Sequence, residues 1–197
     1  MTNDVLKRGV FVAALFPLIL LLVDAFTGNL TANPIEYITH QTGTYALALL
    51  MITLGVTPLR RLTGWNSIIR ARRMLGLFTF FYATLHLLTW VVLDQFFAFG
   101  FMVEDIIERP FITAGMATYL LLLPLAITSN TKMIQRLGRR WTLLHRLIYL
   151  AAGIAVLHFW WLVKADIREP RLWAIALSVL LGVRIFWFLQ NRLSSRS

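Results

Sequence analysis

Six long apolar segments constrain the fold of this chain more than any other feature. Each is long enough, or nearly so, to cross a bilayer core of roughly 30 Å as a helix, and 58% of the 197 residues are hydrophobic while only 14% are charged. A soluble domain does not bury that much apolar surface. We therefore predict an all-α, polytopic membrane protein, a six-transmembrane-helix bundle that forms one domain over residues 1–197. The segments are residues 9–26, 43–57, 74–93, 111–128, 141–163 and 172–189.

The starts of the first two segments carry further signals. No small-residue cleavage site of the A-x-A type follows residues 9–26, so we expect a retained helix there and not a signal peptide. Residues 43–57 are short for a span, but Asn33 and Pro34 precede them as a suitable N-cap and first helical residue. We therefore expect the second helix to begin near residue 34.

The positions of Lys and Arg predict the orientation of the bundle, because cytoplasmic loops of membrane proteins are enriched in these residues. One set of loops holds thirteen basic residues and the opposite set holds four, so we predict that the N and C termini are both cytoplasmic. We attribute the net charge of +10 to this orientation signal. We expect no nucleic acid partner, because the basic residues form no continuous stripe. The larger set is Lys7, Arg8, Arg60, Arg61, Arg70, Arg72, Arg73, Lys132, Arg136, Arg139, Arg140, Arg192 and Arg196, and the smaller set is Arg109, Lys164, Arg168 and Arg171.

Three histidines lie inside the apolar segments, His86 in the third and His145 and His158 in the fifth. A titratable ring in hydrocarbon is costly without a partner, which makes each of them a candidate site residue. The odd-numbered spans run outward, so at about 1.5 Å per residue His86 and His158 both lie beyond the midplane, towards the outer face, where they can meet. His145 lies one turn from the cytoplasmic end, about 19.5 Å from His158 along the helix axis.

A facing pair of histidines has several interpretations. The rings could be hydrogen-bonded core residues, and a structural zinc site would need four ligands where only two are at hand. The chain has no cysteine, which excludes thiolate ligands and the C-x-x-C-H motif of a c-type haem. Two imidazoles on opposite faces of a flat apolar ring fit the axial positions of haem b, so we favour His86 and His158 as ligands of haem iron. A transporter with a proton relay and a structural membrane anchor without haem are the alternatives.

The spacing within the fifth segment adds a geometric constraint. Thirteen residues at 100° per residue leave His145 and His158 about 140° apart around an ideal helix. A bulge or bend near Gly153 would bring them to one face. Without such a bend, the two histidines lie on different faces of the helix and contact different neighbours.

The chain resembles the ferric-reductase-like transmembrane domain family, whose six spans carry haem histidines on the third and fifth. The motifs that carry the resemblance cover nearly the whole chain: NPIEYITHQTG, TPLRRL, RARRMLGLFTFFYATLHLLTW, RPFITAGM and LGRRWTLLHRLIYLAAGIAVLHFWWLVK. They are most similar to those of haem-binding membrane subunits of the bacterial inner membrane. The resemblance implies an electron-transfer subunit that is not itself the sulfoxide-reducing catalyst. Its donor would be the quinol pool or a cytoplasmic flavin reductase, its acceptor a periplasmic molybdopterin enzyme acting on methionine sulfoxide, and FMN a further cofactor.

One departure from the family pattern concerns the cytoplasmic half. Larger members carry a second histidine on the third span, whereas Arg72 stands fourteen residues before His86. Arginine is a poor iron ligand because it stays protonated, but it pairs well with a propionate or phosphate. We therefore expect one haem, and two if His145 binds a second haem. The iron of that second haem would have no second protein ligand, or one that is not a histidine. The nearby arginines could instead hold haem propionates or FMN phosphate; they are Arg72, Arg73, Arg140 and Arg146.

Three further features leave alternatives open. His40, near the outer start of the second span, could be an interfacial polar residue or a base at a quinol site. Arg184, within the sixth span, could contact a propionate or quinone, or snorkel towards the cytoplasm. Residues 96–108 mix aromatic and acidic side chains, and could rest in the membrane interface or dock a partner.

Overall fold

The computed structural model describes residues 3–163 and 166–194, and every regular element in this part of the chain is a helix. Among these described residues, six helical stretches are long and apolar enough to cross a membrane, which confirms the predicted all-α architecture with six spans. The α-helices are α1 (Asn3–Thr27), α2 (Pro34–Thr63), α3 (Arg72–Leu88), α4 (Phe99–Glu108), α5 (Pro110–Ile127), α6 (Thr131–Leu137), α7 (Arg139–Leu144), α8 (Leu147–Leu162) and α9 (Arg168–Ser194). A 3-10 helix, η1 (Asn66–Arg70), precedes α3, and a π-helix, η2 (Thr89–Asp94), continues it.

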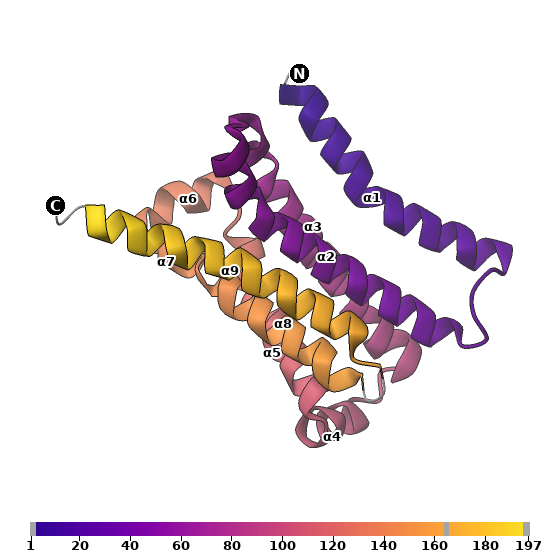
Figure 1. Ribbon diagram of the computed structural model, residues 1–197. Helices are drawn as coiled ribbons and strands as arrows, with labels where there is room; N and C mark the ends of the chain where they lie inside the picture. The colour runs from indigo at the N-terminus through magenta and orange to yellow at the C-terminus, as the bar shows by residue number, and fades with distance from the viewer. Residues whose placement is uncertain (1–2, 164–165, 195–197) are drawn as a thin grey trace.

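Two helix pairs form the centre of the bundle: α2 packs along α3, and α5 packs along α8 (Figure 1). Helix α3 also contacts α5, while α9 contacts α8 and α2. Helix α3, which carries His86, therefore packs mainly on α2. Helix α8, which carries His158, packs mainly on α5. Figure 1 shows the start of α1 and the end of α9 on the side of the bundle opposite α4. We call these two sides the terminal end and the α4 end.

The start of α2 follows the expected capping chemistry. The Asn33 side chain accepts a hydrogen bond from the backbone N–H of Glu36, and Pro34 is the first helical residue. Both residues suit these positions because the first backbone N–H groups of a helix lack partners within the helix. The predicted start of the second helix near residue 34 is confirmed.

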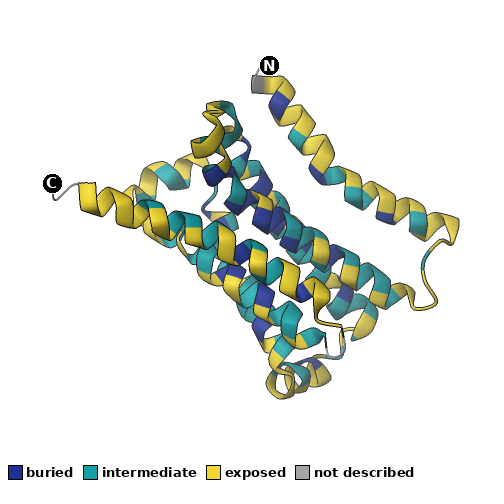
Figure 2. Cartoon of the chain, in the orientation of Figure 1, coloured by how far each residue is buried: buried dark blue, intermediate teal, exposed yellow. Residues whose placement is uncertain are grey.

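Two apolar clusters hold the helices together. In the larger one, Leu50 and Leu54 of α2 pack with Ala152 of α8 and Leu177 of α9. The alanine lets the backbones of α2 and α8 approach, as small residues do between membrane helices. Figure 2 shows the buried residues along the inner helix faces, with exposed residues predominating on α1 and α9. Apolar side chains on those outer faces suit contact with lipid.

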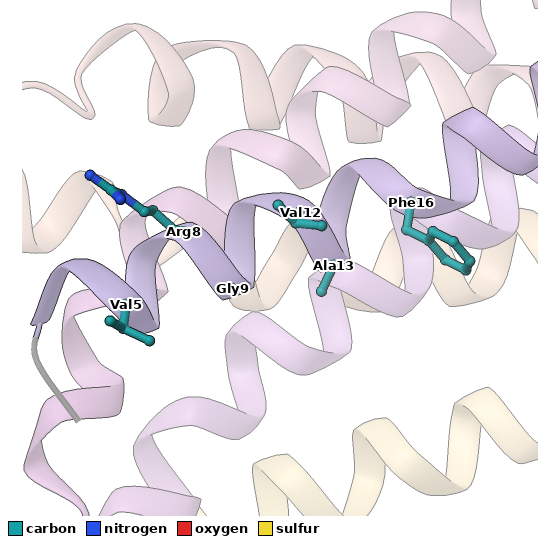
Figure 3. A pocket seen from close by; sticks show the side chains of 6 residues that line it. All are labelled: Val5, Arg8, Gly9, Val12, Ala13 and Phe16. Atoms are coloured by element: carbon teal, nitrogen blue, oxygen red, sulfur yellow. The ribbon is translucent and has the colours of Figure 1, made fainter.

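Helix α1 packs against the bundle through apolar side chains and is also hydrogen-bonded by a buried tyrosine. Tyr82 of α3 is fully buried, and its hydroxyl donates to the Ala14 carbonyl (2.7 Å) and accepts from the Leu18 N–H (3.2 Å). Elsewhere α1 is mostly exposed, and Figure 3 shows a pocket along its first turns. None of the predicted site residues lines this pocket, which is formed by Val5, Arg8, Gly9, Val12, Ala13 and Phe16.

The fifth span is interrupted where the sequence did not suggest it. Helix α7 ends at Leu144, α8 begins at Leu147, and His145 and Arg146 form the junction. Helix α8 continues without a break through Gly153, so the bend considered there is absent. The interruption lies directly beside His145.

The α4 end contains two elements that the apolar pattern did not predict. The π-helix η2 begins three residues after His86, and Phe96 and Phe97 follow it with φ angles of 47° and 61°, which non-glycine residues seldom adopt. Helix α4 is amphipathic: Met102 is buried against the bundle, while Glu104 and Glu108 are exposed on the opposite face. π-Helical turns are often found at functional sites.

Candidate functional site

His86 of α3 and His158 of α8 face each other near the α4 end of the bundle. Their ring centroids are 6.0 Å apart, and the ring planes are inclined at 75°. Neither ring is on the outer surface, since both residues are partly buried among the helices. The predicted proximity of these two histidines is confirmed.

Each of the two rings is held by a backbone carbonyl of the neighbouring helix. The Nδ1 atom of His86 lies 2.9 Å from the carbonyl oxygen of Thr39 in α2, and Nδ1 of His158 lies 2.6 Å from that of Phe111 in α5. A carbonyl only accepts hydrogen bonds, so each Nδ1 must carry the proton and donate it. This fixes the tautomer that leaves a lone pair on Nε2, the form in which histidine binds metals.

The separation of the two ring centres is close to the value expected for two imidazoles that share a metal. A metal–imidazole bond is about 2 Å long and Nε2 lies about 1 Å from its ring centre, so two rings on opposite sides of one metal have centres about 6 Å apart. The observed separation is 6.0 Å. Among the described residues, neither Nε2 atom has a hydrogen-bonding partner in the protein. Two neutral Nε2 donors at this ring separation could therefore bind one iron.

Other kinds of metal site find less support. In the described part of the chain, no group of three or more His, Cys, Asp or Glu side chains could hold a metal ion. A structural zinc site needs four such ligands. The donor set present, two neutral imidazoles in an apolar surrounding, suits the axial positions of a haem, whose porphyrin supplies the other ligands.

A pair of threonines links α2 to the end of α3 beside His86. The Thr39 hydroxyl donates to the Thr89 hydroxyl (3.1 Å), which in turn donates to the His86 carbonyl (2.7 Å). Thr89 is the first residue of η2, and its bond to the carbonyl three residues earlier is one that helical threonines commonly make. The same residue of α2 thus binds the ring of His86 through its carbonyl and the end of α3 through its hydroxyl.

His145 lies in a different environment, close to the end of α5 that is remote from α4. Its Nε2 atom is 3.1 Å from the Thr128 hydroxyl, and its ring stacks on Trp141 with centroids 3.9 Å apart. The Trp141 indole also donates to the Thr128 carbonyl at 3.0 Å. His145 is thus part of a hydrogen-bonded junction between α5, α7 and α8, and its Nε2 is already engaged.

The four arginines predicted to hold a phosphate or propionate differ in burial. Arg72 is partly buried, and one of its terminal nitrogens lies 3.5 Å from the Thr57 hydroxyl of α2. Arg73, Arg140 and Arg146 are exposed. Of the four, Arg72 alone reaches into the bundle.

Arg184 has a specific partner that neither snorkelling nor a ligand contact would have suggested. Its guanidinium donates to the carbonyl of Leu54 in α2 at 2.5 Å and lies over the ring of Tyr149 at 5.5 Å. In a regular helix the Leu54 carbonyl would accept from the N–H of residue 58, but Pro58 has none. Arg184 therefore satisfies a carbonyl that a proline has left without its helical donor.

The site also contains an internal repeat that the sequence analysis did not detect. The carbonyl residue, a glycine one turn later and the histidine are Thr39, Gly43 and His86 in one helix pair, and Phe111, Gly115 and His158 in the other. Every member of the second set follows its counterpart by 72 residues. In this register the counterpart of His145 is Arg73, not Arg72. The repeated glycine-to-histidine spacing was the signal available in the sequence.

Comparisons with known proteins show the family of the chain. The family model for the ferric reductase like transmembrane component matches residues 8–156. The chain is 49% identical over 190 residues, 95% of its length and 87% of the relative, to the protein-methionine-sulfoxide reductase heme-binding subunit MsrQ of Herminiimonas arsenicoxydans. It is 50% identical over 184 residues, 92% and 85% of the two chains, to MsrQ of Ralstonia nicotianae, and 49% identical over 192 residues, 97% and 92%, to MsrQ of Rhodospirillum rubrum. No solved structure matches the chain.

Proposed function

The chain belongs to the ferric reductase like transmembrane family, and on that basis we propose that it is the haem-binding electron-transfer subunit of a methionine sulfoxide reductase system. The observation that carries the proposal is the pair of imidazoles whose Nδ1 protons are fixed by carbonyls and whose centroids lie 6.0 Å apart. A haem b held there supplies a one-electron redox centre. The protein itself performs no sulfoxide chemistry in this scheme.

The roles of the residues follow from their contacts. His86 and His158 would bind the iron through Nε2, while the carbonyls of Thr39 and Phe111 hold the rings in place and raise their basicity. The apolar helix faces around the pair would exclude water from it. His145 is the candidate for a second, inner haem, and such a haem would require His145 to release the Thr128 hydroxyl.

Support for an outward direction of electron flow comes from charge and position. The basic loops lie at the terminal end, which the positive-inside rule places in the cytoplasm, and the facing histidines lie nearer the α4 end. We propose that electrons enter from the quinol pool or a cytoplasmic flavin reductase. They leave at the α4 end to the periplasmic molybdopterin enzyme MsrP. Arg72, Arg73, Arg140 and Arg146 would bind haem propionates or the phosphate of FMN near the cytoplasmic face.

The test uses membrane vesicles of known sidedness. The haem is first reduced, and purified MsrP with methionine sulfoxide is then added to one face at a time while haem absorption is followed. Reoxidation that requires both additions at the periplasmic face supports the proposal. Equal reoxidation from the cytoplasmic face, or none from either face, contradicts it. A colourless purified protein would favour the structural anchor or the proton relay.

A further inference from the structure

Both candidate iron ligands press against a glycine of the neighbouring helix. A Cβ atom placed on Gly43 would lie 3.0 Å from Cε1 and 3.1 Å from Nδ1 of His86. A Cβ atom on Gly115 would lie 2.9 Å from Cε1 and 3.0 Å from Nδ1 of His158. Distances this short leave no room for a methyl group unless the imidazole moves.

The position of each glycine explains why no side chain fits. The Cα–Cβ bond of a helical residue points towards the helix N-terminus, so a side chain covers the turn before its own. Gly43 lies four residues after Thr39, and Gly115 lies four residues after Phe111. A Cβ atom would therefore enter the space beside the carbonyl that accepts the Nδ1 proton. The carbonyl and the glycine together form one slot for an imidazole.

The slot is specific to these two positions. Gly153 lies in the same helix as His158, and Gly182 lies in α9, yet a Cβ atom on either would meet nothing within 4 Å. The two slots recur 72 residues apart with identical spacing from carbonyl to glycine to histidine. A repeated slot on both sides of one ring pair points to a requirement of the site and not to general helix packing.

We propose that Gly43 and Gly115 are positioning residues that set the orientation and the basicity of the two iron ligands. The inference rests on the proposed haem-binding function and extends it to residues outside the ligand pair. A methyl group at either position would push the ring away from its carbonyl and weaken the Nδ1–H···O=C hydrogen bond. The imidazole then becomes a weaker donor to iron, which disfavours the ferric state and raises the reduction potential.

The experiment compares Gly43→Ala and Gly115→Ala with Gly153→Ala and Gly182→Ala in the purified full-length protein. Loss of a hydrogen bond behind a metal ligand costs about 10–100-fold in affinity. We expect each of the first two variants to bind haem b that much more weakly and to show a higher reduction potential. The two control variants should keep the wild-type affinity, spectrum and potential. Wild-type potentials in Gly43→Ala and Gly115→Ala would overturn the proposal.

A second measurement covers the case in which an alanine variant fails to fold. In His86→Gly, free imidazole added to the solution can enter the vacated slot and restore the low-spin spectrum. Adding Gly43→Ala to His86→Gly should raise the imidazole concentration needed by about tenfold. An unchanged imidazole requirement would show that the glycine does not shape the slot. If His86→Ala and His158→Ala do not alter the spectrum at all, the proposed haem ligation fails instead, so the two failures are distinguishable.

Discussion

The rings of His86 and His158 lie 6.0 Å apart although each histidine is hydrogen-bonded to a different partner helix, His86 to α2 and His158 to α5. The ligand pair therefore lies between two helix pairs, α2 with α3 and α5 with α8. Each helix pair supplies one ring and the carbonyl that binds its Nδ1 proton. This arrangement keeps both Nε2 atoms directed away from competing hydrogen bonds.

His145→Ala tests whether the inner histidine is independent of the outer pair. Because His145 bonds Thr128 and stacks on Trp141, its loss should leave the low-spin signal of the outer haem intact. Electron flux from the cytoplasmic side should fall if His145 serves a cofactor there. Absorption spectra and flux measured on the same membranes provide the check. Full cofactor content together with full flux would make His145 a purely structural residue, and loss of the outer signal would contradict the separation of the two sites.

Tyr82→Phe tests how α1 is attached. The change removes a hydroxyl that bridges the Ala14 carbonyl and the Leu18 N–H of α1, and a hydrogen bond of this kind contributes about 0.5–1.5 kcal/mol net. We expect a loss of that size in the free energy of unfolding measured in detergent. Tyr119→Phe is the matched control, because its hydroxyl makes a longer contact of 3.4 Å with Thr84. Equal losses in the two variants would argue against a special role for Tyr82.

Arg184→Met and Pro58→Ala form a double-mutant cycle. Arg184→Met alone should destabilise the protein by about 1–3 kcal/mol, because the Leu54 carbonyl loses its donor. In the Pro58→Ala background residue 58 regains an N–H that can bond this carbonyl, so the same change should cost less. Unfolding free energies of the four proteins give the coupling, expected to be about 1 kcal/mol. Identical losses in both backgrounds would show that Arg184 acts elsewhere.

Glu104→Lys and Glu108→Lys test whether α4 docks the electron acceptor, one of the two roles considered for residues 96–108. Both acids are exposed, whereas Asp105 must be kept because it bonds Arg109 at 3.1 Å and Gln95 at 2.9 Å. If the partner approaches this face, the reversals should slow electron transfer at low salt, and the difference should vanish at high salt. Glu169→Lys, an exposed acid at the start of α9, is the control. Equal transfer rates at low salt would exclude the acids of α4 from docking.

The features predicted correctly from sequence depend on length and depth. Six spans follow from the apolar segments, and the proximity of His86 and His158 follows from their similar depth in two parallel helices. The start of α2 was predictable because Asn33 and Pro34 satisfy local backbone requirements. Such features need no knowledge of which helices become neighbours.

The features that were missed depend on contacts between distant segments. The partner of Arg184 is a carbonyl 130 residues away, made available by a proline in another helix. The break at His145 depends on contacts with Thr128 of the preceding span, and a regular helical projection does not include them. The glycine slots were visible in principle as a spacing repeated after 72 residues, but the physical reason for that spacing appears once the rings are placed against the glycines.

The central claim is that His86 and His158 bind one haem iron together, and it is tested most directly by the haem content and low-spin signal of single variants. His86→Ala and His158→Ala should each abolish the low-spin signal of the outer haem, because each removes one of two axial bonds. The helices should still insert, since the apolar spans are unchanged. His40→Ala, at an exposed position in α2, should keep the signal. A wild-type low-spin spectrum and reduction potential in either His86→Ala or His158→Ala would contradict the account.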